Sequence, residues 1–181
     1  RWVRLENASR SWAIANDATY GWDVTRHQND RRGTWSQVRA TLVKSARFPD
    51  PDQDQGQHQW NFRIVPDASV LEAVAAGQQI NLGEREVSGA PVDAPFSVSG
   101  AVVESVALAP DRSGDLVIRL YEAEGGPSRV TFRAPKAGSV TACDLRYRPS
   151  ESEPELRGGQ GEWSFDLSAF QITTLRVSFA K

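Results

Sequence analysis

The chain has 181 residues with a formal net charge of −2 and a pI near 5.8, so it lacks the basic footprint of a nucleic-acid-binding protein. No apolar run approaches the ~18 residues that a membrane span requires, so we expect no membrane partner. The one cysteine, Cys143, excludes an intramolecular disulfide and favours a buried thiol in a cytoplasmic protein. The sequence contains no methionine, from which we expect a piece of a longer polypeptide.

Alternating apolar and polar residues in the first half of the chain predict half-buried antiparallel strands. The pattern is clearest at 38–42 and at 60–64, where apolar residues occupy every second position. Tyr20 and Trp22 are also two positions apart, which places them on one face of a strand. Gly21 between them would allow another backbone to approach closely.

One short helix is expected within residues 66–78. Ser69 and Glu72 have the spacing of a capping box, in which each side chain bonds the backbone N–H of the other residue. Gly77 could supply the left-handed residue that ends such a helix. The helix is therefore predicted to be short and to interrupt an otherwise β-rich sequence.

A domain boundary is expected near 88–96, where Gly and Pro interrupt every periodic pattern. Beyond it, about six short strands are predicted, with apolar alternation at 116–120, 163–167 and 175–179. Their spacing is typical of a small sandwich with an immunoglobulin-like outline. The fold class is therefore all-β, an antiparallel β-sandwich with one short helix, divided into domains 1–93 and 94–181.

An acidic loop, "PDPDQDQGQH" at 49–58, places carboxylates at alternate positions from Asp50 to Asp54. A calcium loop of this type needs Gly at its sixth position and Glu at its twelfth, where this chain has Gln55 and Asn61. The remaining interpretations are a solvated turn, a pair of catalytic acids, or one wall of a larger site.

Other chemistry finds little support in the sequence. No nucleophile-elbow or phosphate-binding glycine motif is present, and two histidines with one distant cysteine have no zinc-ligand spacing. His27 is interpreted as an exposed loop residue, and His58 as a residue that could orient the acidic loop. Tryptophans in phase with strand cores are assigned to the core: Trp12, Trp35, Trp60 and Trp163. Tyr20 and Trp22 remain the better candidates for stacking on a sugar.

Four stretches together carry a family resemblance: "WAIANDATYGWDV", "VKSARFPDPDQDQGQHQWNFRIVPDAS", "VIRLYEAEGGPSRVTF" and "AFQITTLRV". In this order the chain resembles the C-terminal region of glycoside hydrolase family 38 α-mannosidases over essentially all its length. Where the family often has "RSP" before the acidic loop, this chain has residues 46–49, "ARFP".

The resemblance implies a retaining α-mannosidase as the parent protein, with zinc and the nucleophile in an N-terminal barrel outside this chain. Residues 1–93 would be the end of a large, galactose-mutarotase-like super-sandwich, and 94–181 a small terminal sandwich. The implied partners are the catalytic and helical domains of the same parent chain and a mannose-containing glycan. No catalytic residue, metal ligand or cofactor is expected in this chain, which should be inactive alone.

The resemblance carries a role over to three residues of the acidic loop. Asp52, Asp54 and Gln55 become candidates for hydrogen bonds to sugar hydroxyls or for bracing neighbouring loops, with Tyr20 and Trp22 as further substrate-binding candidates. Two alternatives stay open: an independent carbohydrate-binding module that uses Tyr20 and Trp22, and a purely structural domain.

Overall fold

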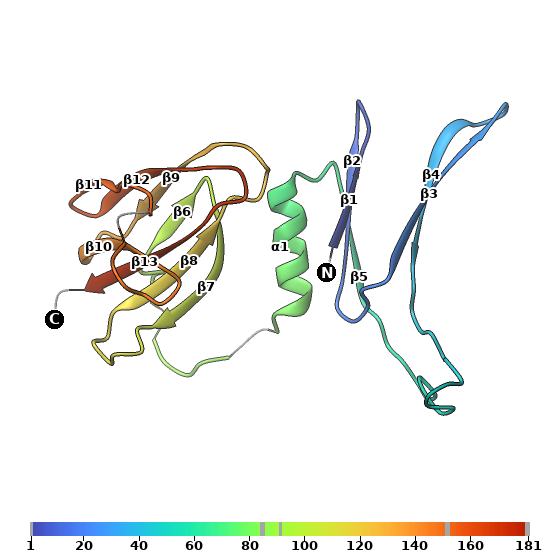
Figure 1. The fold of residues 1–181 in the computed structure, drawn as a ribbon, viewed down its shortest axis with the longest axis horizontal. Coiled ribbons are helices and arrows are strands. Elements are labelled where there is room, and N and C mark those ends of the chain that lie inside the picture. The colour runs from blue at the N-terminus through green and yellow to red at the C-terminus, as the bar shows by residue number, and fades with distance from the viewer. Residues whose placement is uncertain (1, 84–85, 91, 151–152, 180–181) are drawn as a thin grey trace. The chain divides into compact units, whose positions relative to one another are not determined.

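The computed structural model describes residues 2–83, 86–90, 92–150 and 153–179. The chain divides into two compact units, Arg1–Glu86 (unit 1) and Val87–Lys181 (unit 2), each with its own sheets (Figure 1). The predicted domain boundary, between residues 93 and 94, lies in the same irregular stretch of the sequence as this division.

Unit 1 contains a three-stranded antiparallel sheet and a separate two-stranded ribbon. The sheet has the order β1 (Trp2–Glu6), β2 (Ser11–Asn16), β5 (Phe62–Pro66), and the ribbon pairs β3 (Trp22–Asn29) with β4 (Gly33–Ala40). Each strand pairs in register with its neighbour, so the period-two pattern of the sequence does correspond to strands.

Helix α1 (Val70–Asn81) begins as predicted. The Ser69 side chain accepts a hydrogen bond from the backbone N–H of Glu72, and the Glu72 carboxylate accepts one from the backbone N–H of Ser69. The predicted capping box is therefore confirmed. With 12 residues, the helix that the described residues form is too short to cross a membrane.

The predicted end of the helix at Gly77 is wrong, since α1 continues to Asn81 and its C-cap is Leu82. Gly77 is instead buried in the helix, where an added Cβ would lie 2.8 Å from Cδ1 of Trp2. The glycine therefore permits close packing of the helix against β1, although glycine within a helix costs about 1 kcal/mol relative to alanine.

The core of unit 1 is small. Ala13, Ala68 and Ala73 form its buried cluster, and Val65 packs against them. On the opposite face of β5, Phe62 and Ile64 are exposed, so the expectation that these alternating residues form a core face is wrong. The alternation exists, but no second layer among the described residues of unit 1 covers that face.

Unit 2 is a sandwich of two four-stranded antiparallel sheets. One sheet has the order β10 (Ala137–Cys143), β13 (Ile172–Phe179), β8 (Leu116–Tyr121), β7 (Val102–Leu108). The other has the order β11 (Arg157–Gly159), β12 (Glu162–Leu167), β9 (Ser128–Arg133), β6 (Ser97–Ser99). The prediction of an all-β fold with an antiparallel sandwich and one short helix is confirmed.

Side chains from both sheets of unit 2 meet in one core. Its buried members are Ile118, Leu120, Val130, Phe132, Ala134, Trp163, Phe165, Leu167, Leu175 and Val177. The apolar alternations predicted at 116–120, 163–167 and 175–179 thus do point inward, because each sheet has the other to cover it.

Candidate functional site

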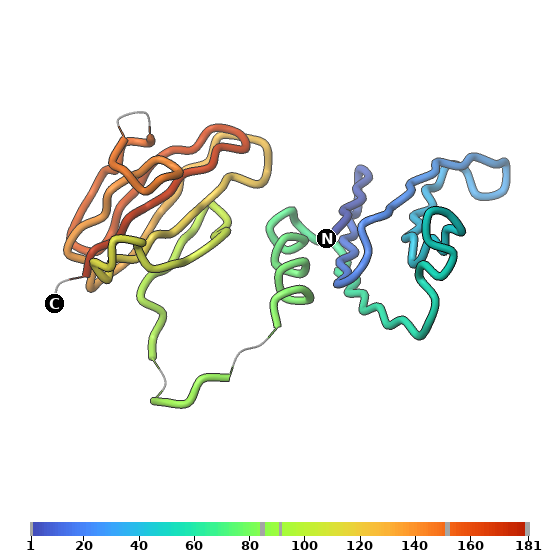
Figure 2. The backbone as a smooth tube through the Cα atoms, turned by 60° about the horizontal axis from the view of Figure 1, so that its bottom comes forward, coloured from blue at the N-terminus to red at the C-terminus, as the bar shows by residue number. Residues whose placement is uncertain are grey.

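The acidic loop lies within a long irregular segment of unit 1. β4 ends at Ala40 and β5 begins at Phe62, and the residues between them run outward and back, with loop 49–58 at the far end (Figures 1 and 2). Asn61 anchors the returning segment, because its backbone N–H and its amide both donate to the Asp17 carboxylate, at 3.1 and 2.6 Å. This pair was not predicted from the sequence, in which its one signal is that Asp17 directly follows the strand β2.

Asp54 fixes the shape of the loop. Its Oδ2 accepts hydrogen bonds from the backbone N–H groups of Lys44 and Ser45, both at 3.1 Å, while Nε2 of His58 lies 2.9 Å from its carbonyl oxygen. The donors at Ser45 and Lys44 lower the pKa of the Asp54 carboxyl, so it is ionised at neutral pH. Asp54 thus braces the backbone at residues 44 and 45, and His58 bonds to the backbone of the acidic loop, while a contact of Asp54 with a sugar stays a prediction.

Asp52 and Gln55 lie exposed on the outer turn of the loop. The Gln55 amide donates to the carbonyl oxygen of Pro51 at 3.2 Å and to Oδ1 of Asp52 at 3.3 Å, and the Gln55 backbone N–H donates to the carbonyl oxygen of Asp52. Carboxylate and amide oxygens held this way can accept hydrogen bonds from the hydroxyls of a ligand.

Tyr20 and Trp22 differ in their surroundings. The Tyr20 side chain is 73% exposed, whereas Trp22 is half-buried and packs edge-on against Phe62, with ring centroids 6.3 Å apart. The carbonyl oxygen of Gly21 accepts a hydrogen bond from the backbone N–H of Thr41 at 2.8 Å, which confirms the close approach of another backbone. Among the described residues, neither Tyr20 nor Trp22 makes a hydrogen bond or a ring contact with the acidic loop.

Two further assignments are corrected by the structure. Trp163 is buried as predicted, but Trp12 is 41% exposed and, like Trp35, lines an open groove. His27 belongs to strand β3 rather than to a loop, and its ring stacks on Trp35 of β4 with centroids 4.2 Å apart. In an antiparallel ribbon these two residues lie directly opposite each other, a pairing that the sequence shows only once the turn at 30–32 is located.

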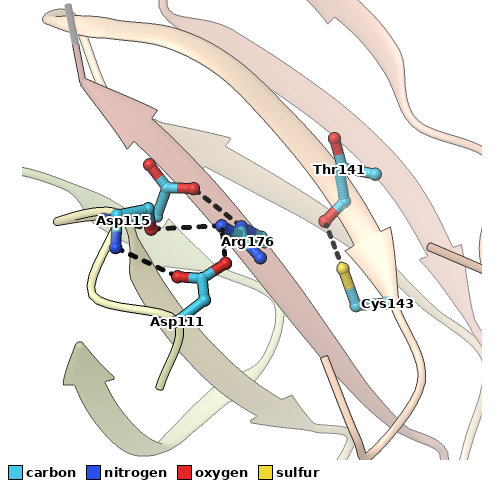
Figure 3. A network of polar contacts seen from close by, with 6 residues as sticks. Asp111, Asp115, Thr141, Cys143 and Arg176 are labelled. Atoms are coloured by element: carbon cyan, nitrogen blue, oxygen red, sulfur yellow. Dashed lines mark hydrogen bonds and ion pairs between the residues drawn. The ribbon is translucent and has the colours of Figure 1, made fainter. Parts of the chain in front are cut away.

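Polar clusters in unit 2 brace its loops. The Arg176 guanidinium donates to Asp111 and Asp115, each at 2.7 Å, and to Ser113 at 3.1 Å, which ties the β7–β8 turn to β13 (Figure 3). Cys143, on the neighbouring strand β10, is fully buried as predicted, and burial raises the pKa of its thiol.

Glu122 accounts for part of the "YEAEGG" sequence. Its buried carboxylate accepts hydrogen bonds from the backbone N–H groups of Glu124, Gly125 and Phe170, at 2.6 to 2.9 Å. The donor at Phe170 contributes most to lowering the pKa of the Glu122 carboxyl. Three main-chain donors surround this carboxylate, so the residue organises two turns and is not a proton donor at neutral pH.

The described residues do not form a metal site. No group of three His, Cys, Asp or Glu side chains among them is close enough together to hold an ion.

Comparison with known proteins finds a likeness for the sandwich of unit 2. Residues 100–175 match the family described as the glycosyl hydrolases family 38 C-terminal beta sandwich domain. The matched segment contains the buried core strands β8, β9 and β12 and the Arg176 loop partners Asp111 and Asp115.

A whole-chain relative extends the likeness to unit 1. Alpha-mannosidase G from Dictyostelium discoideum is 21% identical over 193 aligned residues, which cover 97% of this chain and 17% of that protein. The chain therefore spans less than a fifth of the length of this relative. Together the two comparisons confirm the predicted resemblance to the C-terminal region of glycoside hydrolase family 38 enzymes.

Proposed function

We propose that this chain is the non-catalytic C-terminal β region of a longer, cytoplasmic α-mannosidase that hydrolyses terminal α-linked mannose. The zinc ion and the catalytic nucleophile belong to the N-terminal part of that protein. The family match over 100–175 and the similarity to Alpha-mannosidase G along nearly the whole chain support this proposal.

The chain's own contribution is to shape the substrate site, and the braced acidic loop is the observation that carries this role. Asp54 is anchored through main-chain N–H groups at Lys44 and Ser45, so Asp52 and Gln55 are presented in a fixed geometry. Their oxygens accept hydrogen bonds from mannose hydroxyls, and Asp54 acts as a positioning residue. Holding acceptors in place before binding reduces the entropy lost when the sugar is bound.

The catalytic and helical domains of the parent chain are the partners of this region. Phe62 and Ile64 form an exposed apolar face on β5, and burial of such a face stabilises an interface by roughly 25 cal/mol per Å². These partners cover this face in the parent protein.

Kinetics of the parent enzyme test the loop's role. Asp52→Asn and Gln55→Ala should each lower kcat/KM for 4-nitrophenyl α-mannoside at least tenfold, with an unchanged unfolding temperature. Asp93→Asn, at an exposed carboxylate outside the loop, is the matched control. Values within twofold of the unaltered enzyme for both loop variants would refute the role, and turnover by the purified chain alone would refute the non-catalytic assignment.

One observation favours a second candidate function, an independent carbohydrate-binding module. Tyr20, two positions before Trp22 in the sequence, is 73% exposed, and exposed aromatic rings can stack on sugars. In that case methyl α-mannoside should change the tryptophan fluorescence of the isolated chain at millimolar concentration, and Tyr20→Ala should remove the response.

A further inference from the structure

Unit 1 contains a groove that the acidic loop does not share. It lies between the β1–β2 end of the sheet and the β3–β4 ribbon and has a volume of about 580 Å³, within the range usual for ligand sites. Its lining includes Trp12, Trp35, Arg10, Arg26 and Asn7.

The aromatic part of the groove is held in place before any ligand binds. One face of the Trp35 ring is covered by His27, with centroids 4.2 Å apart and the planes 20° from parallel. His27 is itself fixed by Gln37, whose Oε1 lies 3.1 Å from Nε2 of the imidazole. Trp35 therefore enters the groove as a rigid platform, and the 41% exposed Trp12 adds a second indole.

Trp35 also has an unmet hydrogen-bonding need. Its indole Nε1 is buried and has no hydrogen-bond partner among the described residues. A buried donor left unpaired costs about 1–3 kcal/mol, so such groups in native proteins call for an explanation. Because Nε1 is itself buried, a ligand in the groove would meet the Trp35 ring and not this donor.

The polar part of the groove supplies donors of fixed geometry. Arg10 and Arg26 are exposed at its wall, and each guanidinium presents planar N–H donors. Glu6 also lines the groove, but its carboxylate pairs with Arg4 at 2.7 Å. Asn7 accepts bonds from the backbone N–H groups of Ser9 and Arg10, which fixes the turn that carries Arg10.

We propose that this groove is a glycan-binding site, separate from the acidic loop, that takes one or two neutral hexose units. Flat indole faces fit the C–H faces of a pyranose, while the guanidinium N–H groups of Arg10 and Arg26 donate to its ring and hydroxyl oxygens. The choice of mannose as the hexose rests on the proposed function; the choice of a sugar rests on the groove.

Calorimetric titration of the chain with α-1,3-linked mannobiose tests the site. Binding in the millimolar range is expected, weakened at least tenfold by Trp12→Ala and by Trp35→Ala. Trp35→Phe keeps a ring and removes the N–H donor, so it should have a smaller effect than Trp35→Ala. Phe170→Ala, at an exposed ring of unit 2, is the matched control and should leave the affinity unchanged.

Each result of this titration tests the groove proposal independently of the proposed role of the acidic loop. Binding that is lost in Tyr20→Ala but kept in Trp12→Ala would overturn it in favour of the other aromatic site. Absence of binding at tens of millimolar mannobiose would also overturn it, whereas the kinetics of the parent's loop variants test the proposed function alone. Circular dichroism shows whether Trp35→Ala keeps the fold. If that variant unfolds, the affinity of Trp12→Ala for mannobiose is the deciding measurement.

Discussion

Ile118 in unit 2 and Ile64 in unit 1 occupy equivalent places in alternating strand sequences, yet Ile118 is fully buried and Ile64 is 62% exposed. In unit 2, a second four-stranded sheet covers the face that carries Ile118. In unit 1, the small cluster of Ala13, Ala68 and Ala73 occupies the other side of the sheet, and β5 leaves its larger apolar residues open. Alternation thus indicates which residues share a face, whereas burial depends on a partner layer.

The largest expected effect comes from truncating the two isoleucines. Ile118→Ala should destabilise unit 2 by about 2–5 kcal/mol, because it removes buried methyl groups and leaves a cavity. Ile64→Ala should change stability by less than about 0.5 kcal/mol, as at other exposed sites. Urea unfolding of the chain, followed by circular dichroism, measures both. Equal losses would show that the β5 face is covered in solution.

Two glycines provide a second contrast between the units. Gly100 has φ +81°, and an added Cβ would lie 2.2 Å from the backbone oxygen of Arg129, which cannot move aside. Gly100→Ala should therefore cost about 1–3 kcal/mol. Gly77→Ala meets only the Trp2 side chain and gains about 1 kcal/mol of helix propensity, so its net effect should be smaller. Thermal unfolding measures both variants. A larger fall in unfolding temperature for Gly77→Ala than for Gly100→Ala would contradict this interpretation.

The ion pairs of the two units should respond differently to pH. Ser113 and then Arg176 lower the pKa of Asp111 from 3.8 to about 2. The stabilisation from this carboxylate is therefore complete above about pH 4 and is lost as the pH falls through about 2. Arg176→Met should lower the urea midpoint above pH 4, by an amount that shrinks towards pH 2.

A matched variant in unit 1 provides the control for this pH dependence. Arg39→Met removes the pair between Arg39 and Asp23, whose side chains are 61% and 51% exposed on the ribbon. Because solvent screens such a pair, the urea midpoint should show no resolved change at any pH. A pH-dependent loss as large as that of Arg176→Met would contradict the contrast.

The smallest signal is the reactivity of the single thiol. Cys143 is fully buried in unit 2 and burial raises its pKa, so a disulfide reagent should modify it slowly in native conditions. Its modification should accelerate in Ile118→Ala and stay unchanged in Ile64→Ala. Fast modification of the unaltered chain would show that unit 2 opens more readily than its core suggests.

Local sequence signals predicted much of this fold. The capping box at Ser69 and the alternation around Leu120 and Phe165 depend on neighbours three and two positions away, and the structure confirms them. The role of Gly77 was misassigned because a glycine is needed there for close packing against Trp2, a residue far away in the sequence. Tertiary contacts of this kind leave no periodic signal.

The residues of the candidate site could be predicted from the sequence, but the contacts between them could not. The acidic loop was recognised from its own residues, but the bonds from Lys44 and Ser45 to Asp54 use main-chain groups that every sequence contains. Trp12 and Trp35 were assigned to the core because strand phase does not distinguish a covered face from an open groove. Whether Asp52 and Gln55 contact a sugar stays a prediction.

The hydrogen bonds from main-chain N–H groups to Asp54 have a consequence for how the sequence of this loop can change. Because the carboxylate holds residues 44 and 45 by their backbones, these two bonds do not depend on which side chains stand at those positions. The stretch "ARFP" at 46–49 lies between these two anchored residues and the outer turn of the loop. The side chains at positions 44 and 45 can therefore change while the main-chain bonds that support the loop are kept.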